Sequence, residues 1–243
     1  MSSGTALVTG GSSGIGAAVA LRLADAGWDV VVSGRDRVRL DAVAAACGGS
    51  AVVADLASAE GVGTVRAAAD GRVRLLVHGA GLGWAGPVQD TPAPTADAML
   101  AVNLAAPIRL TTALLPTLRT RDGHVVFIAS VAAVGVGGEA VYSATKAGLR
   151  GFADAVRLES GVRVTTILPG AVDTPYFARR GTAYHRSFPR PVSADRVAAA
   201  VVDAVGRNRS EVFVPRWLTL GSRVHGAVPA TFARLSRRFD PPH

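Results

Sequence analysis

The chain has 243 residues, 49% of them hydrophobic, and a formal net charge of +8. These values exclude a disordered protein, and the length is that of one compact domain spanning residues 1–243. The single cysteine, Cys47, excludes an intrachain disulfide. The arginines are spread along the chain without interleaved aromatic residues, so we expect a solvated surface and no nucleic-acid partner. We also expect no bound metal ion.

The hydropathy pattern bears on where the protein is located. The N-terminal residues MSSGTALVTGG lack the basic start and apolar stretch of a secretory signal. The best uncharged run, His124 to Gly138, is shorter than the roughly 18 to 20 apolar residues that cross a bilayer. We therefore expect a cytoplasmic protein without a transmembrane segment.

The first half of the chain alternates short apolar runs with helical patterns. A strand at Thr5 to Thr9 is followed by a glycine-rich turn and by apolar residues at helical spacing, Ile15, Val19 and Leu23. The unit then repeats, with strands at Asp29 to Ser33, Ala51 to Val53 and Arg72 to Val77 and with helices at Asp36 to Ala46 and Ala59 to Ala69.

The second half continues the alternation. The predicted elements are a helical stretch from about Thr95 to Leu118 that bends or breaks near Pro107, a strand at His124 to Ala129, a helix at Tyr142 to Leu158, a strand at Arg163 to Leu168, a helix at Ser193 to Val205 with Ser193 as N-cap, and a strand at Glu211 to Val214. This order predicts an α/β fold, a Rossmann-type doubly wound parallel sheet in three α/β/α layers.

Two segments do not follow the alternation. Periodicity fails at about residues 171–192, where the aromatic residues are Tyr176, Phe177, Tyr184, His185 and Phe188. A long aromatic loop at the ligand-binding edge predicts a substrate lid. The C-terminal extension, about residues 215–243, mixes apolar residues with Arg216, Arg223, Arg234, Arg237 and Arg238. We expect a helix over the substrate cleft or at a subunit contact, with a basic helix on a membrane surface as the alternative.

The turn after the first strand has the pattern of a dinucleotide site. Thr9 to Gly16 reads T-G-G-S-S-G-I-G and opens the first helix. Glycines let the backbone approach a pyrophosphate, and the free N–H groups of a helix N-terminus attract the anion. A P-loop would need a Lys-Ser or Lys-Thr pair after the last glycine, and none follows.

The ends of the second and third strands bear on the choice of nucleotide. An NAD site usually has an acidic residue after the second strand, but here Gly34 and then Arg35 follow. An arginine is a charge-assisted partner for a 2′-phosphate, so we favour NADP(H) over NAD(H), although Asp36 is close. Asp55 is either an acceptor for the adenine amino group or a helix N-cap.

Tyr142 and Lys146 stand at i and i+4, on one face of a predicted helix. Lys146 is the only lysine of the chain. An ammonium about 4 Å from a phenol contributes roughly 4 kcal/mol at an effective dielectric near 20, or about three pKa units before desolvation opposes it. We therefore expect the pKa of Tyr142 to fall toward neutrality, where general acid–base catalysis works best.

These residues, in this order, resemble the short-chain dehydrogenase/reductase family in its compact single-domain branch. The resemblance covers about Thr5 to Thr174 by motif and the whole length more loosely. It implies that Tyr142 is the proton donor or acceptor and that Lys146 also holds the nicotinamide ribose. It further implies that Ser130 binds the substrate oxygen and that the backbone of Asn103 anchors a water-linked proton path.

The resemblance also extends to the cofactor site. Pro169-Gly170 with Val172 and Thr174 is similar to the family segment that holds the nicotinamide carboxamide. The expected cofactor-binding residues are Gly10, Ser12, Ser13, Gly14, Ile15, Gly16, Arg35, Asp55, Leu56, Gly79, Ala80, Gly81, Tyr142, Lys146, Pro169, Gly170, Val172 and Thr174.

The chain departs from the family pattern in two places. His78-Gly79-Ala80-Gly81 stands where the family has N-N-A-G, so the asparagine that ties neighbouring strands is absent. His78 is expected to be a packed residue or one on the adenosine side, and not a catalyst. The interval from Ser130 to Tyr142 is one residue shorter than usual in the family.

The sequence as a whole predicts an oxidoreductase that reduces a ketone or aldehyde, or oxidises a secondary alcohol, with NADP(H). The aromatic loop favours a small-molecule substrate with an apolar body. The alternatives are an NADP(H)-binding regulator without activity and a non-redox member of the fold such as a dehydratase. The family resemblance implies a homodimer or homotetramer.

Overall fold

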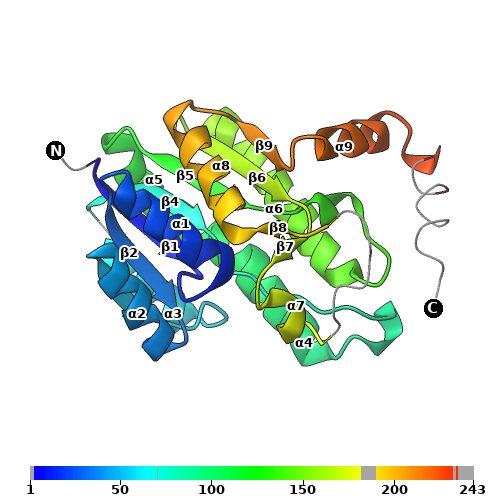
Figure 1. The fold of residues 1–243 in the computed structure, drawn as a ribbon, viewed down its shortest axis with the longest axis horizontal. Helices are drawn as coiled ribbons and strands as arrows, with labels where there is room; N and C mark the ends of the chain where they lie inside the picture. Colours follow the sequence, from blue (N-terminus) through cyan, green and yellow to red (C-terminus); the bar gives the residue numbers. More distant parts are fainter. Residues whose placement is uncertain (1–2, 70, 182–189, 232–233, 235–243) are drawn as a thin grey trace.

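A parallel sheet runs through the centre of the protein. The computed structural model describes residues 3–69, 71–181, 190–231 and 234. Seven strands lie in the order β3-β2-β1-β4-β5-β6-β9, all parallel (Figure 1). Their bounds are β1 (Thr5–Thr9), β2 (Asp29–Gly34), β3 (Ser50–Val53), β4 (Val73–His78), β5 (His124–Ile128), β6 (Arg163–Pro169) and β9 (Glu211–Val214). The strand order reverses between β1 and β4, and the carboxyl ends of these strands border the switch point where such sheets bind ligands.

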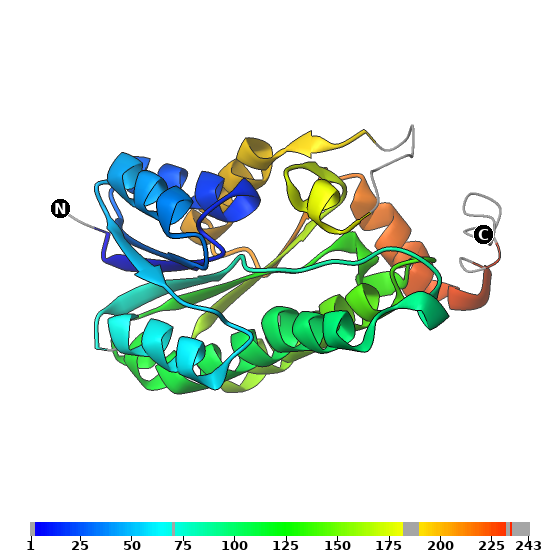
Figure 2. The same ribbon diagram turned by 90° about the horizontal axis from the view of Figure 1, so that it is seen from below.

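Helices cover both faces of the sheet, as the edge-on view in Figure 2 shows. One face carries α1 (Gly14–Asp25), α2 (Arg37–Cys47) and α8 (Ala194–Gly206). The other carries α3 (Ala59–Ala69), α5 (Ala106–Thr120) and α6 (Ala140–Glu159), with α4 (Ala93–Leu100) leading into α5. The predicted three-layer doubly wound fold is therefore confirmed.

Alternate strand residues supply the two halves of the core. Val8 packs with the α1 and α8 layer, whereas its neighbour Leu7 packs with α3, α5 and α6. Both side chains are fully buried. A parallel strand buried on both faces needs apolar residues at every position, which is why β1 reads as a continuous apolar run and not as an alternating one.

The helical stretch from 93 to 120 breaks earlier than predicted. A π-helical turn at Ala101–Ala105 separates α4 from α5. Pro107 lies in the first turn of α5, where a missing N–H leaves no helix hydrogen bond unmade. The proline therefore starts the second helix, and the break precedes it.

The same stretch, Ala93–Thr120, is the one described helix that is long and apolar enough to cross a membrane, which differs from the run at His124 singled out in the sequence. Length and composition alone are weak evidence for a span. Leu110, Leu114 and Leu118 are fully buried in the core of this fold.

The described part of the predicted substrate loop is more regular than its sequence indicates. It contains β7 (Val172–Asp173), the one-turn helix α7 (Tyr176–Arg179) and β8 (Val192–Ser193), and β7 pairs with β8. Tyr184, His185 and Phe188 lie outside the described residues. Ser193 accepts a hydrogen bond from the backbone N–H of Arg196 at 3.2 Å, which confirms it as the N-cap of α8.

Helix α9 (Leu218–Ala227) begins beside the carboxyl ends of β6 and β9 and then extends away from the body of the protein (Figure 1). Leu218 packs with Phe213 and Leu168. A Cβ at Gly170 would lie 2.9 Å from a Leu218 methyl group. The start of α9 thus packs against the ends of β6 and β9, and its predicted place over a substrate cleft stays a prediction. Arg237 and Arg238 lie outside the described residues.

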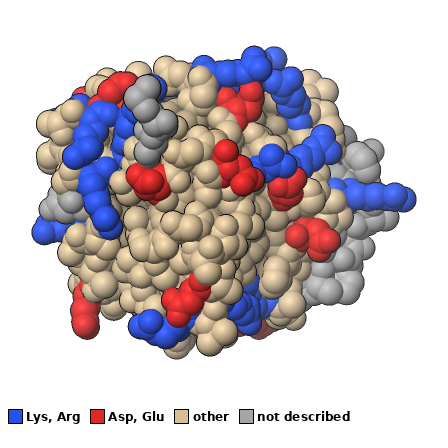
Figure 3. Space-filling model, turned by 60° about the vertical axis from the view of Figure 1, so that its left-hand side comes forward, with Lys and Arg blue, Asp and Glu red and all other residues tan. Residues whose placement is uncertain are grey.

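Charged side chains of both signs are interspersed on the face shown in Figure 3, around a large uncharged area. No continuous basic surface is visible on that face. The view agrees with a solvated distribution of the arginines.

Candidate active site

The turn between β1 and α1 depends on glycines, because a side chain at these positions would force neighbouring backbone to move. Gly10 has a φ of 70°, and a Cβ there would lie 2.7 Å from the backbone nitrogen of Ala80. A Cβ at Gly16 would lie 2.2 Å from the carbonyl oxygen of Gly10. The turn and the start of α1 are therefore in backbone contact. Ser13, the N-cap of α1, makes no side-chain hydrogen bond to the first N–H groups of the helix, which leaves them for an anion.

Thr9 ties the end of β1 to the end of β4. Its hydroxyl accepts hydrogen bonds from the backbone N–H groups of Gly79 at 3.1 Å and Ala80 at 3.3 Å. The sequence predicts that a strand-tying asparagine is missing here. The threonine side chain makes such a tie from the neighbouring strand.

His78 is a packed core residue, as expected. Its Nε2 lies 2.8 Å from the hydroxyl of Thr111, and its ring stacks on Phe127 with centroids 5.0 Å apart. Burial lowers the pKa of His78 to about 3. The imidazole is therefore neutral and packed between Thr111 and Phe127.

At the end of β2, Arg35 is followed by Asp36, whose carboxylate is already bound by Arg39. Asp36 caps α2 by accepting from the N–H of Arg39 at 3.1 Å, and its other oxygen lies 3.0 Å from the Arg39 Nε. Arg35 is exposed, and no hydrogen bond or ion pair within the described part of the chain holds its side chain. Ser12 lies beside this site, because its Oγ is 3.3 Å from where a Cβ of Gly34 would be.

Asp55 follows β3 and forms a local turn. Its carboxylate accepts from the N–H of Ala57 at 3.0 Å. Ser58, which accepts from Gly61 N–H at 3.0 Å, caps α3 instead. Of the two interpretations of Asp55, the helix N-cap is therefore wrong, and the adenine contact stays a prediction. The next residue, Leu56, is buried.

The segment after β6 lies against the first turn. The side chain of Thr174 comes within 3.3 Å of where a Cβ of Gly14 would be. Its hydroxyl lies 3.4 Å from both the carbonyl oxygen of Val172 and the N–H of Tyr176. The two parts of the predicted cofactor site, Gly10 to Gly16 and Pro169 to Thr174, are thus adjacent in space.

Ser130, Tyr142 and Lys146 come together at the carboxyl end of β5. The Ser130 hydroxyl is close enough to Tyr142 to lower the pKa of its phenol, although the interval between the two residues is one residue shorter than usual in the family. The ammonium of Lys146 lies 5.7 Å from the centroid of the Tyr142 ring and donates to the carbonyl oxygen of Ile128 at 2.8 Å. It also lies 3.8 Å from where a Cβ of Gly81 would be.

The pKa of Tyr142 differs from the sequence expectation. Burial raises it to about 12, and this outweighs the hydrogen bonds from Ser130 and Tyr176, which lower it. Burial also lowers the pKa of Lys146 to about 8. The expectation of a strongly acidified phenol is therefore wrong for this structure, because desolvation is the larger effect and the ammonium points to a backbone carbonyl.

Asn103 is fully buried in the π-helical turn. Its side chain exchanges two hydrogen bonds of 2.8 Å with the backbone of Leu82 and donates to the hydroxyl of Thr145 at 3.1 Å. The asparagine thus joins the loop after β4 to the helix that carries Tyr142 and Lys146. Its predicted role in a water-linked path stays a prediction.

The sequence did not identify the residues that surround Tyr142 from the loop side. The ring of Tyr176 contacts that of Tyr142, with centroids 5.8 Å apart. Arg180, which is 8% exposed, forms an ion pair with Glu139 at the start of α6 and lies 4.7 Å from the Phe177 ring centroid. The available signal was the aromatic and arginine composition of the loop, which does not say which side chains turn inward.

Arg179 makes a further contact that the sequence did not indicate. Its guanidinium donates to the Oγ of Ser13 at 2.8 Å and to the carbonyl oxygen of Pro175 at 3.2 Å. A cation from α7 therefore stands at the glycine turn.

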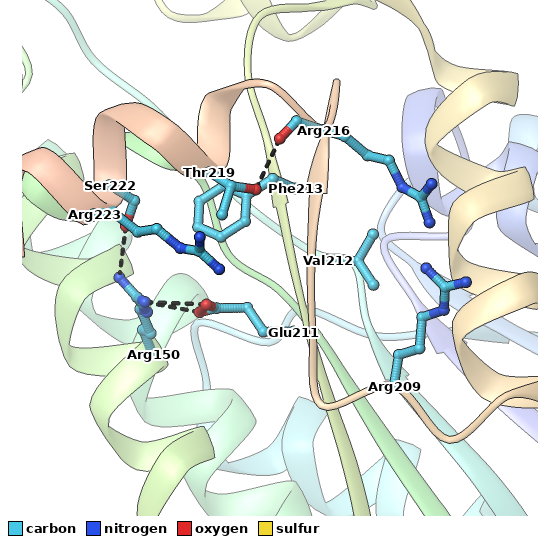
Figure 4. Close-up of a pocket in the computed structure, with 9 residues that line it drawn as sticks. All are labelled: Arg150, Arg209, Glu211, Val212, Phe213, Arg216, Thr219, Ser222 and Arg223. Atoms are coloured by element: carbon cyan, nitrogen blue, oxygen red, sulfur yellow. Dashed lines mark hydrogen bonds and ion pairs between the residues drawn. The ribbon is translucent and has the colours of Figure 1, made fainter.

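A separate basic hollow of about 550 Å³ lies at the β9 edge (Figure 4). Its lining includes four arginines, and Arg150 pairs with Glu211 at 2.7 Å and contacts Ser222 at 3.5 Å. Arg209 and Arg216 approach one another across the other side of the hollow in Figure 4. None of the residues assembled around Tyr142 lines it.

Comparison with known proteins identifies relatives over most of the chain. The family described as short chain dehydrogenase matches residues 4–184. Serine 3-dehydrogenase from Rhizobium radiobacter is 35% identical over 216 residues, which cover 82% of this chain and 86% of the relative.

Solved structures agree with the sequence comparison. A short-chain dehydrogenase from Sphingobium yanoikuyae in complex with NADPH matches with a TM-score of 0.82 and 31% identity, covering 93% of this chain and 95% of that one. A 3-ketoacyl-(acyl-carrier-protein) reductase from Brucella melitensis complexed with NADH matches with a TM-score of 0.79 and 26% identity, covering 88% and 98%.

Proposed function

Because the chain belongs to the short-chain dehydrogenase family, we propose that it is an NADP(H)-dependent oxidoreductase that reduces a ketone or aldehyde, or oxidises a secondary alcohol, with Tyr142 as general acid and base. The observation that carries the proposal is the cluster at the end of β5. The hydroxyl of Ser130 lies close enough to the phenol of Tyr142 to lower its pKa, and the ammonium of Lys146 lies 5.7 Å from the centroid of the ring.

Each residue of this cluster has a chemical role in the proposal. Ser130 and Tyr142 hold the substrate oxygen with their hydroxyl groups. In reduction the O–H bond of Tyr142 breaks and its proton moves to the substrate oxygen, leaving a phenolate that the ammonium of Lys146 stabilises. Asn103 fixes the loop and the helix on either side of the lysine.

The glycine turn fits a dinucleotide. A Cβ at Gly10 or Gly16 would collide with neighbouring backbone, so these glycines hold the turn against the start of α1, whose first N–H groups would bind the pyrophosphate. When bound, the nicotinamide supplies or accepts the hydride. Thr174 and Gly170 would hold its carboxamide side, and Asp55 the adenine.

Arg35 supports NADP(H) as the preferred form. The nearest carboxylate, Asp36, is already engaged by the N–H and guanidinium of Arg39, so it is a poor partner for a ribose hydroxyl. The exposed Arg35 would pair with a 2′-phosphate. The relative crystallised with NADPH is consistent with this preference, whereas the one crystallised with NADH shows that the family fold accepts either form.

The proposal is tested by turnover of a panel of ketones, aldehydes and secondary alcohols, followed at 340 nm with each dinucleotide. We expect consumption of NADPH with at least one carbonyl compound, and slower or no consumption of NADH. The panel should include serine, because one relative is a serine 3-dehydrogenase. It should also include compounds with apolar bodies, because the loop residues Tyr176 and Phe177 are aromatic.

The alternatives give different results in the same assay. A regulator would bind NADPH without turning over any compound of the panel. A dehydratase would consume a hydroxy compound, detected by mass spectrometry, without any change at 340 nm. Either result would contradict the proposed reaction.

A further inference from the structure

Helix α7 brings an arginine to the turn between β1 and α1. Pro175 is the N-cap of α7, and its carbonyl oxygen accepts from the backbone N–H of Arg179 at 3.2 Å. The Nε of Arg179 donates to the same oxygen at 3.2 Å, so the side chain folds back along the helix. Its Nη2 donates to the Oγ of Ser13 at 2.8 Å. Two hydrogen bonds therefore hold the guanidinium beside the turn.

The residue before Pro175 is packed against the same turn. The methyl carbon of Thr174 lies 3.3 Å from where a Cβ of Gly14 would be. The loop after β6 and the turn after β1 are therefore in contact at two places, Thr174 on Gly14 and Arg179 on Ser13. The place of Arg179 is thus set by the packing of its whole segment as well as by its own hydrogen bonds.

The turn has no cation of its own. Residues 9–16 read T-G-G-S-S-G-I-G, without a basic side chain. A helix N-terminus carries a partial charge of roughly half an elementary charge, whereas a diphosphate carries negative charge on both of its phosphate groups. The backbone alone would therefore balance only part of the charge of a bound diphosphate.

The guanidinium of Arg179 has donors left for such an anion. The contacts to Pro175 and Ser13 engage Nε and Nη2, and Nη1 makes no hydrogen bond to any described residue. No carboxylate in the described part of the chain forms an ion pair with this side chain. The residue is exposed, so a ligand can reach it. The planar N–H fork of an arginine matches the geometry of phosphate oxygens.

The other cations around the candidate active site are engaged elsewhere. Arg180, the next residue along the chain, is buried and forms an ion pair with Glu139. Lys146 is buried and donates to the carbonyl oxygen of Ile128. Among the residues that the structure describes, Arg179 is the only basic one that hydrogen-bonds the turn of residues 9–16.

We propose that Arg179 is a cofactor-binding residue, whose guanidinium binds the diphosphate of the dinucleotide together with the first N–H groups of α1. The N–H groups donate and the phosphate oxygens accept, in charge-assisted hydrogen bonds. This inference rests on the proposed function, because it requires a dinucleotide at the glycine turn. It gives Arg179 a different task from Arg35, since NADPH and NADH share the diphosphate but only NADPH has the 2′-phosphate.

The dissociation constant of NADPH, measured by calorimetric titration on the full chain, tests the proposal. Arg179→Gln removes the charge but keeps an amide that can donate to Ser13. We expect NADPH affinity to fall about tenfold, the low end of the effect of one hydrogen bond to a charged group, because Arg179 is exposed. An unchanged affinity would overturn the proposal, because the charge of Arg179 would then play no part in binding.

Salt provides a second readout, which loss of a merely structural contact would not move. At about 1 M salt the screening length falls to about 3 Å, and an exposed charge pair is weakened. The difference in NADPH affinity between the unchanged protein and Arg179→Gln should therefore narrow as salt is raised. A difference that is the same at low and high salt would also overturn the proposal.

Arg66→Gln is the matched control. Arg66 is likewise exposed and lies in the last turn of α3, which runs from the carboxyl edge of the sheet back toward its amino edge. The substitution removes the same charge from the protein at a distance from the turn, so NADPH affinity should stay unchanged. A loss as large as that of Arg179→Gln would show that net charge, and not a contact at the turn, controls binding.

The second dinucleotide separates the two phosphate sites. Arg179→Gln should weaken NADPH and NADH by the same factor, whereas Arg35→Ala should weaken NADPH alone. A loss in Arg179→Gln that is confined to NADPH would place Arg179 at the 2′-phosphate and overturn the assignment to the diphosphate.

Failure of this inference is distinguishable from failure of the proposed function. If the unchanged protein binds neither dinucleotide, the proposed function itself fails. If the unchanged protein and Arg179→Gln bind NADPH equally well, the function stands and Arg179 is removed from the cofactor site.

Discussion

At the residue scale, the protonation state of Tyr142 bears on the direction of the proposed reaction. A pKa of about 12 keeps the phenol protonated at neutral pH, and reduction requires this form because the tyrosine must donate. Oxidation requires the phenolate, which is scarce under those conditions. The burial that makes the phenol a weak acid therefore holds Tyr142 in the form that can donate a proton.

Arg35→Ala tests the assignment of the nucleotide. If Arg35 pairs with a 2′-phosphate, its removal deletes a charge-assisted interaction of about 1.5–3 kcal/mol, so NADPH affinity should fall roughly 10- to 150-fold. NADH affinity should barely change, because NADH lacks that phosphate. Both dissociation constants are measured by fluorescence titration, and an equal loss for both dinucleotides would contradict the assignment.

Thr9→Val tests the tie between β1 and β4. The valine keeps the shape of the side chain but cannot accept from the N–H groups of Gly79 and Ala80. Leaving a buried donor without a partner costs about 1–3 kcal/mol. Gly79 and Ala80 are half-buried, so urea unfolding should report a loss of about 1 kcal/mol, at the low end of that range. A variant as stable as the unchanged protein would show that solvent satisfies these groups.

At this scale the sequence predicted which residues form the site better than it predicted where their side chains point. The spacing of Tyr142 and Lys146 predicted their common helix face, and burial of His78 was also expected. The direction of the Lys146 ammonium depends on Ile128, which is distant in sequence. For the same reason Tyr176 could not be assigned to Tyr142, since the contact forms only when β5, α6 and α7 meet.

At the element scale, regular strands and helices were predictable where one periodicity continued without interruption. β1, α3 and β9 have the predicted bounds. The π-helical turn at Ala101–Ala105 was not predicted, because its residues have ordinary helical composition. Its Asn103 is held by Leu82 and Thr145, so the signal for the break lies in tertiary contacts.

Gly16→Ala tests the contact between the first turn and α1. The added methyl would lie 2.2 Å from the Gly10 carbonyl oxygen, so the turn must move away from the helix N-terminus. We expect dinucleotide affinity to fall by more than about tenfold, since backbone approach to the pyrophosphate is lost. Calorimetric titration measures the effect.

The matched control for that substitution is Gly63→Ala within α3. It meets nothing within 4 Å, and alanine should stabilise the helix by roughly 0.5–1 kcal/mol without changing dinucleotide binding. Equal binding by Gly16→Ala and Gly63→Ala would contradict the assigned role of the turn.

At the scale of the whole molecule, the alternating pattern was sufficient to predict the doubly wound sheet, because right-handed crossovers leave few other topologies. The sequence could not predict the layout of α9, whose mixed apolar and basic residues suit several environments. Leu218 packs against Phe213, a contact that depends on the position of β9 at the sheet edge.

Two buried histidines should make the protein sensitive to acid. Burial lowers the pKa of His78 from 6.5 to about 3 and that of His124 from 6.5 to about 4. Between these values the unfolded state binds more protons than the folded one. Stability is therefore fully present above about pH 6.5 and falls as pH decreases, by roughly 1.4 kcal/mol per pH unit for each histidine.

His78→Gln isolates one of these contributions. The amide can still hydrogen-bond Thr111 but does not titrate, so the decline of unfolding free energy between about pH 6 and pH 4.5 should be shallower than in the unchanged protein. Urea unfolding over this pH range measures both slopes, and parallel slopes would show that His78 is not buried as a neutral group.

The central claim, that Tyr142 transfers the proton in a dinucleotide-dependent redox reaction, is tested most directly by Tyr142→Phe. The measurement is turnover at 340 nm on the substrate that the unchanged protein reduces fastest, with NADPH affinity determined in parallel. The account predicts a loss of at least about a hundredfold in turnover with NADPH binding retained. Turnover by Tyr142→Phe at the unchanged rate would contradict it.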